Sequence, residues 1–179
     1  AMRLLNANGY NAIATLLDAL RLVRVDGAAV QAAFAQVCAE PSWSAAGPAP
    51  LVVECTEPDL WVAMPRAALN EVLVNLLRNG LAASANQAPL RLGICLTSDM
   101  APVTALEAVV IAIRDCAAPL AFDAVQHPAS DHGLGLVRAL VNQYGGALDV
   151  VVAPAPWTKA VAVRLPRAYP AAAETAAPP

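Results

Sequence analysis

Lysine is almost absent from this chain of 179 residues: Lys159 is the only one, so arginines carry nearly all of the positive charge. The net charge is −3 at pH 7, which argues against a nucleic-acid partner. No apolar run approaches the roughly 18 residues that a membrane-spanning helix needs. The chain is nevertheless 58% hydrophobic, and much of that fraction is alanine. These features predict one domain with a substantial core and a biased composition rather than burial in lipid.

Paired cysteines are also missing. The four cysteines are scattered without a CxxC pair, so a zinc site is not expected. Cys55 and Cys95 lie in strand-like runs and are interpreted as small core residues of a protein in the reducing cytosol. Residues 1–5 lack the charged-then-apolar layout of a signal peptide. The leading Ala1 and Met2 are consistent with a fragment of a longer protein.

The order of periodic segments predicts the fold class. The predicted helices cover 4–23, 28–39, 69–83 and 133–144, and the predicted strands cover 51–55, 60–64, 90–97, 108–114, 147–152 and 159–165. Pro41–Pro50, Ser98–Thr104 and 115–131 read as loops, and the Ala/Pro-rich end after residue 168 reads as a disordered tail. Helices alternating with strands in hairpin-like pairs indicate an α+β domain with a mixed sheet.

The segment Leu69–Ala83 combines an apolar stripe with a polar edge. Helical spacing places five apolar residues on one face (Leu69, Val72, Leu73, Leu76 and Leu77). Glu71, Asn75 and Asn79 follow one another at intervals of four along a single edge. Because asparagine is a mediocre helix former, this edge is either a set of oxygen ligands for Mg²⁺ and phosphate or an ordinary solvated face.

Periodicity also predicts which residues share a core between the sheet and the two long helices: Leu73, Leu76, Leu77, Val110, Ile111, Ile113, Leu136 and Leu140.

Two other places carry candidate chemistry. Asp115 ends a strongly apolar strand, where it is either a turn or cap residue or an acceptor for the exocyclic amino group of a base. Gly133 and Gly135 open a helix whose free N–H groups suit phosphate, although turn glycines are common. His127 and His132 are interpreted as exposed loop residues. A Ser/His/Asp hydrolase has no support, because no GxSxG sequence is present.

Taken together, these segments resemble the ATP-binding catalytic domain of bacterial sensor histidine kinases, the Bergerat-fold ATPases also seen in gyrase and Hsp90. The resemblance covers about 25–166 and rests on four segments in the right order: Leu69–Ala83 as the N box, Ala108–Asp115 as the strand leading to the G1 aspartate, Gly133–Leu136 with its helix as the G2 box, and Trp157–Pro166 as the closing strand.

The resemblance implies a two-layer α/β sandwich over 25–168, preceded by the end of a dimerisation-type helix at 1–24 and followed by the tail at 169–179. It implies Mg²⁺ and ATP as cofactors. The implied roles are Glu71 as the catalytic residue, Asn79 as the Mg²⁺ ligand with Asn75 beside it, Asp115 at the adenine amino group, and Gly133, Leu134, Gly135 and Leu136 at the phosphates.

Several residues depart from the family pattern. Ala117 and Pro119 stand where the G1 box has glycines, and Asp131 stands where a lid glycine is expected. Gly80 replaces the usual alanine after Asn79, and Ala82 replaces a frequent lysine. If the G1 positions need positive φ, neither alanine nor proline fits them well. Weak or altered nucleotide binding is therefore expected.

These departures keep several functions open. The first is a kinase domain of a two-component system that phosphorylates a histidine on a dimerisation segment, in a homodimer that signals to a response regulator. The second is a pseudokinase-like or phosphotransfer-like domain that docks a response regulator or partner kinase without ATP turnover. An anti-sigma-factor kinase fits less well. The expected location is the cytoplasm, including the cytoplasmic part of a membrane-bound receptor.

Overall fold

The computed structural model describes residues 22–44, 51–84, 92–100, 107–117 and 133–170. In chain order they form β1 (Leu22–Arg24), α2 (Gly27–Cys38), α3 (Pro41–Ser44), β2 (Leu51–Cys55), β3 (Trp61–Ala63), α4 (Arg66–Ser84), β4 (Leu92–Met100), β5 (Glu107–Asp115), α6 (Gly133–Gln143), β6 (Ala147–Val152) and β7 (Lys159–Ala168). None of the helices in this described part is long and apolar enough to cross a membrane.

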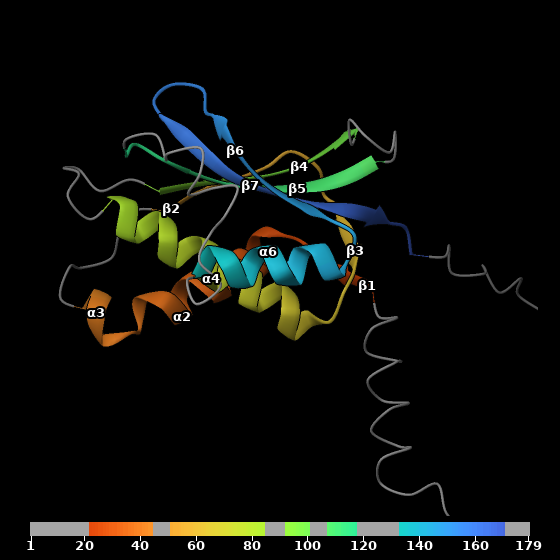
Figure 1. Cartoon of the computed structure of the whole chain (residues 1–179), viewed down its shortest axis with the longest axis horizontal. Helices are drawn as coiled ribbons and strands as arrows, with labels where there is room; N and C mark the ends of the chain where they lie inside the picture. Colours follow the sequence, from red (N-terminus) through yellow and green to blue (C-terminus); the bar gives the residue numbers. More distant parts are fainter. Residues whose placement is uncertain (1–21, 45–50, 85–91, 101–106, 118–132, 171–179) are drawn as a thin grey trace, which may run out of the picture.

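One mixed sheet of seven strands forms the first layer. Its order is β1-β3-β7-β5-β4-β2, and β6 also pairs with β7. The pair β2/β4 is parallel, while β4/β5 and β5/β7 are antiparallel. Helices α2, α4 and α6 lie together on one side of this sheet, as Figure 1 shows. The predicted α+β class and two-layer sandwich with a mixed sheet are confirmed.

Helix α4 packs its apolar stripe against the centre of the sheet. Leu73, Leu76 and Leu77 are at most 1% exposed, and they belong to the same buried cluster as Ile111 and Ile113 of β5. The helical period of 3.6 and the strand period of 2 select these positions. For these five residues the predicted core is confirmed.

The prediction for α6 was one residue out of phase. Leu136 is 42% exposed, whereas Val137 and Val141 are completely buried and Leu140 is only partly buried against the core. A helix rotates by about 100° per residue, so the i, i+4 pair that fills the core excludes its immediate neighbour. Val110 is buried but lies on the opposite face of the sheet from Ile111, because strand side chains alternate.

Local signals located the start of α2 and the end of α6 correctly. Asp26 caps α2, because its Oδ1 accepts a hydrogen bond from the Ala29 backbone N–H at 2.9 Å. Helix α6 ends in Gly145, whose φ is +74°, and the N–H of Gly146 donates to the Val141 carbonyl at 2.9 Å. A left-handed residue at this position is the usual glycine-terminated helix end.

Three predictions about local structure are wrong. Residues Leu22–Arg24 are the strand β1, so the predicted helix does not continue to Val23. Pro41–Ser44 form the short helix α3 within the predicted loop, and β4 continues through Ser98 to Met100. The predicted helix over 4–21, the loop over 118–131 and the tail from 171 lie outside the described residues.

The strands on either side of Glu57 were both expected, but they do not form a hairpin with each other. β2 pairs in parallel with β4, and β3 pairs with β1 and β7 near the far edge of the sheet. Period-2 patterning fixes which residues face the core but not which strand is the neighbour. Cys95 is buried as expected, whereas Cys55 is exposed, contrary to expectation.

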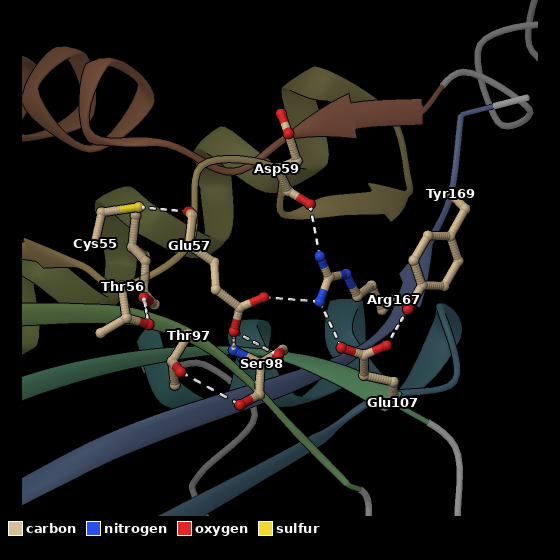
Figure 2. Close-up of polar contacts among 10 residues, drawn as sticks. Cys55, Thr56, Glu57, Asp59, Thr97, Ser98, Glu107, Arg167 and Tyr169 are labelled. Atoms are coloured by element: carbon tan, nitrogen blue, oxygen red, sulfur yellow. Dashed lines mark hydrogen bonds and ion pairs between the residues drawn. The ribbon is translucent and has the colours of Figure 1, made fainter. Parts of the chain in front are cut away.

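A cluster around Arg167, called here the Arg167 cluster, joins the strands at the end of the sheet where β5 begins and β7 ends (Figure 2). Arg167 Nη1 donates to Glu57 Oε2 at 2.8 Å and to Glu107 Oε1 at 2.5 Å, and Nη2 donates to the Asp59 carbonyl at 3.0 Å. Glu57 Oε1 accepts from the backbone N–H of Ser98 at 3.0 Å and from its hydroxyl at 2.5 Å. The cluster fastens the connection between β2 and β3 to the sheet.

Tyr169 completes the Arg167 cluster. Its hydroxyl donates to Glu107, and its ring centroid lies 5.2 Å from the Arg167 guanidinium carbon. The hydroxyl of Ser98, then its backbone N–H, and in addition Arg167 hold the pKa of the Glu57 carboxyl below its usual range. These donors favour the ionised carboxylate in the folded state.

The core assignment predicts a large effect of truncating Leu76. The change Leu76→Ala is expected to lower the free energy of unfolding by roughly 2–5 kcal/mol, because it removes fully buried methyl groups and leaves a cavity. Denaturant unfolding measures this loss. The matched control is Leu136→Ala at an exposed position of α6, which should cost less than about 0.5 kcal/mol. A similarly small loss for Leu76→Ala would contradict the orientation of α4.

The lowered pKa of Glu57 predicts a dependence of stability on pH. A depressed folded-state pKa stabilises the fold above the unfolded-state pKa of about 4.3, and this contribution disappears as the pH falls through the folded-state pKa. The difference in unfolding free energy between the wild type and Glu57→Gln should therefore be largest near neutral pH and shrink in acid. Ser98→Ala, which keeps the carboxylate but removes one donor, should give an intermediate profile. Parallel pH profiles for wild type and Glu57→Gln would refute this prediction.

Candidate functional site

A small cavity opens between α4, the start of α6 and the strand ends opposite the Arg167 cluster. Its volume is about 110 Å³. It is lined by Leu76, Asn79, Gly80, Ala83, Ile113, Asp115, Leu134, Lys159 and Val161. Three candidate residues from the sequence, Asn79, Asp115 and Leu134, therefore meet at one place although they come from three elements.

The polar edge of α4 is not a uniformly solvated face. Glu71 is exposed, but Asn75 is only 6% exposed. Asn75 Nδ2 donates to the Glu71 carbonyl at 2.8 Å and contacts Glu71 Oε2 at 3.4 Å. Asn75 Oδ1 accepts from Arg78 Nη1 at 3.2 Å. Asn75 is thus held by its own helix, which fixes its orientation beneath the start of α6.

Arg78, which sequence reasoning did not single out, links this edge to the turn between α2 and α3. Its guanidinium makes a two-point contact with Glu40, at 3.2 Å from Nε and 2.5 Å from Nη2. The hydrogen bond from Arg78 is also the main reason that the pKa of Glu40 is lowered. A bidentate pair defines the position of the guanidinium, and through it the amide of Asn75.

Asn79 points its amide at the start of α6 without being satisfied there. Among the described residues its Nδ2 atom is buried and has no hydrogen-bond partner. A Cβ atom at Gly133 would lie 3.2 Å from this nitrogen and 3.1 Å from Asn75 Oδ1. A side chain at Gly133 would therefore press on the two amides, which would have to shift by a few tenths of an ångström to admit it. The unpaired Nδ2 indicates that Asn79 has a partner which the described residues do not supply.

Asp115 lies at the other end of the cavity in a buried ion pair. Its Oδ1 accepts from Lys159 Nζ at 2.7 Å and from the Ala117 backbone N–H at 2.8 Å. Asp115 is 1% exposed and Lys159 is 4% exposed. The two residues face each other across β5 and β7 in the sheet register. Asp115 is thus both a cap for the following turn and a wall of the cavity.

Lys159 is the functional candidate that the sequence analysis missed. Two signals could have found it: it is the only lysine in the chain, and it begins the otherwise apolar segment 159–163. A charged residue is rarely buried without a partner. An isolated lysine at the start of a core strand therefore indicates a buried carboxylate across the sheet, and Asp115 occupies the matching position.

The other predicted site residues lie around the cavity rather than in it. Gly133 packs on the asparagine pair, and Gly135 is partly exposed in the first turn of α6. Leu136 and Glu71 are exposed and do not line the cavity. The roles of these residues towards a ligand stay predictions.

The donor set fits a magnesium ion that is shared with phosphate better than a protein-only metal site. Among the described residues, no three His, Cys, Asp or Glu side chains gather as a metal site. Magnesium commonly uses one or two protein oxygens and completes its coordination with phosphates and water. The orphan Nδ2 of Asn79, beside a helix start without a side chain, suits a phosphate oxygen, and Oδ1 of the same amide is the oxygen that a magnesium ion would use.

Comparison with known proteins adds the fold to these observations. No protein-family model and no curated protein sequence matches this chain. The solved catalytic domain of histidine kinase ThkA, in a nucleotide-free form, superposes with a TM-score of 0.59 at 15% identity, over 82% of this chain and 96% of that one. The mycobacterial sensor histidine kinase MprB gives a TM-score of 0.56 at 20% identity, over 82% of this chain and 98% of that one. Over these shared elements the chain has the fold of the catalytic, ATP-binding domains of sensor histidine kinases.

Proposed function

We propose that this chain is the catalytic and ATP-binding domain of a two-component sensor histidine kinase, with weakened nucleotide binding. The observation that carries the proposal is the unpaired buried Nδ2 of Asn79, a donor suited to a phosphate oxygen, which faces the side-chain-free start of α6 at Gly133 and leaves Oδ1 of the same amide as the oxygen that a metal ion would use. Backbone N–H groups at a helix start attract phosphate, and an amide oxygen is a suitable magnesium ligand. The fold shared with histidine kinase catalytic domains supports the same assignment.

Each residue around the cavity has a role in this proposal. Asn79 holds the metal ion, and Asn75, fixed by Arg78, supports the same edge. The turn Gly133–Leu136 receives the phosphates. Asp115 stands at the base end of the cavity. A bound magnesium ion would neutralise charge that develops on the transferred phosphoryl group.

Glu71 is proposed as the catalytic residue towards the acceptor. It is exposed one turn before Asn75, so an incoming histidine on another segment can approach it. A carboxylate at such a position can orient an imidazole and accept its proton. The partners would be the histidine-bearing dimerisation segment of the same or a second kinase, and a response regulator; the full-length protein would be a homodimer working in the cytoplasm.

The alternative is a domain that docks a response regulator or kinase without ATP turnover. The ion pair between Asp115 and Lys159 favours it, because one oxygen of the carboxylate, Oδ1, is already engaged inside the protein. Ala117 also supplies its N–H to the same oxygen. Both features reduce the hydrogen-bonding capacity of Asp115 that remains for a nucleotide. We therefore expect a dissociation constant for ATP on the order of 0.1–1 mM.

The first test removes the proposed metal ligand. In calorimetry with ADP, Asn79→Ala should abolish the part of the binding that depends on Mg²⁺ and leave the metal-free part. The matched control is Asn70→Ala on the same helix, where the side chain instead donates to Gln36 at 3.1 Å. Equal Mg²⁺-dependent binding in Asn79→Ala and wild type would rule out Asn79 as the ligand.

The second test concerns turnover. When a histidine-bearing dimerisation segment is restored, autophosphorylation from radiolabelled ATP should be slow or absent, because the base end of the cavity is engaged by the protein itself. Glu71→Gln should reduce any residual phosphorylation while leaving ADP binding unchanged. Micromolar ATP affinity together with rapid phosphorylation would contradict the proposed weakening of nucleotide binding and would indicate an ordinary active kinase domain.

A further inference from the structure

Arg78 carries a positive charge that lies one amide group away from the start of α6. Its Nη1 donates to Asn75 Oδ1 at 3.2 Å, and that oxygen lies 3.1 Å from the place where a Cβ atom of Gly133 would be. Asn79 Oδ1 lies 3.6 Å from the same place. The guanidinium is therefore next to the two amides that form the phosphate and metal end of the proposed site.

The guanidinium of Arg78 has hydrogen-bonding capacity left for a ligand. Its Nε and Nη2 atoms donate to the two carboxylate oxygens of Glu40, and Nη1 donates to Asn75. A guanidinium carries five N–H groups, so one N–H on each Nη atom is without a partner among the described residues. The side chain is 42% exposed, so a ligand can reach these groups. Phosphate oxygens are the acceptors that such a planar fork recognises well.

The charge of Arg78 acts in opposite directions on a metal ion and on a bare phosphate. Two carboxylates act on Arg78: the hydrogen bond to Glu40, in the first place, and the charge of Glu71 raise the pKa of its guanidinium. A cation at this position repels Mg²⁺ and attracts a phosphate group. Without it, two unopposed carboxylates would lie near the amides, and they would favour Mg²⁺ and repel a nucleotide that carries no metal.

We propose that Arg78 is a specificity-determining residue that allows this site to bind a nucleoside diphosphate without its metal ion. Glu40, in the turn between α2 and α3, holds the guanidinium in place for this role. The inference rests on the proposed nucleotide site and concerns only its phosphate end. It assigns to Arg78 the metal-free part of the binding, the part that Asn79→Ala should leave intact.

The test compares ADP in EDTA with ADP in excess Mg²⁺, titrated into the protein and followed by NMR chemical shifts at low, constant ionic strength. The ratio of the two dissociation constants measures how strongly the site prefers the metal complex. Arg78→Met removes the charge and keeps an unbranched side chain. It should raise this preference by at least about threefold, because metal-free ADP binds more weakly and the Mg²⁺ complex more tightly. Glu40→Gln should lower the preference, because it leaves the charge of Arg78 unopposed.

Two controls separate the charge of Arg78 from its contacts. Arg78→Lys keeps the charge but loses the two-point contact with Glu40, and its ratio should stay near that of the wild type. Arg66→Met removes the same charge from an exposed position at the other end of α4, and it should leave the ratio unchanged. Because salt screens exposed charges, the effect of Arg78→Met should shrink at about 0.5 M KCl, which an effect of packing would not do.

The outcomes separate this inference from the proposed function. An unchanged ratio in Arg78→Met would overturn the role of Arg78 and leave the nucleotide site standing. The same holds if the wild type binds the Mg²⁺ complex but not metal-free ADP. If Arg78→Met does not fold, Glu40→Gln decides: a lowered preference for the metal complex supports the inference, and an unchanged or raised one overturns it. Absence of binding of either form by every variant, wild type included, would refute the nucleotide site itself and the inference with it.

Discussion

The burial of the apolar stripe of α4 against β5 is the interaction on which the rest of the structure depends. Leu73, Leu76 and Leu77 fill the space above Ile111 and Ile113, and this packing sets the rotation of the helix about its axis. Once that rotation is set, Asn75 and Asn79 must face the start of α6. The packing of the apolar face therefore also sets the position of the polar edge, because both belong to one helix and rotate together.

Charge is used differently at the two ends of the sheet. The Arg167 cluster binds exposed and half-buried carboxylates to one arginine, and it fastens a chain connection far from the cavity. The Asp115–Lys159 pair is instead fully enclosed and forms a wall of the cavity. Exposed ion pairs contribute little to folding stability and are screened by salt. Removing one partner of a buried pair is strongly destabilising, because it leaves an uncompensated buried charge. The enclosed pair is thus the one that fixes a wall of the cavity.

The fold and the site give different kinds of information about function. The arrangement of sheet and helices is that of histidine kinase catalytic domains, but a fold can keep its architecture while its site changes. In the proposed function, the amide edge around Asn79 supplies the chemistry that a phosphate ligand needs. At the other end of the cavity, Oδ1 of Asp115 is paired with Lys159. This contrast is the physical reason for proposing weakened nucleotide binding in a domain with this fold.

The sequence by itself determined the elements and most of their buried faces. Four local features could be predicted without a structure: the helical period of Leu69–Ala83, the alternation in β5, the Asp26 cap and the helix end at Gly145. The sequence did not predict which face of α6 is buried, because Leu136 and Val137 are both apolar. Only the tertiary packing places Val137 in the core and Leu136 at the surface. For the site, Asn79 and Asp115 could be named in advance, but their surroundings could not.

Only the tertiary structure decided which strands are neighbours and which charges meet. It paired β2 with β4 rather than with β3, and it brought Lys159 opposite Asp115, 44 residues away in the chain. Periodicity fixes the side of a strand that faces the core, but pairing depends on contacts between segments distant in sequence. The cavity depends on such contacts at every wall, and for that reason only the tertiary structure decided that Asp115 is the carboxylate opposite Lys159.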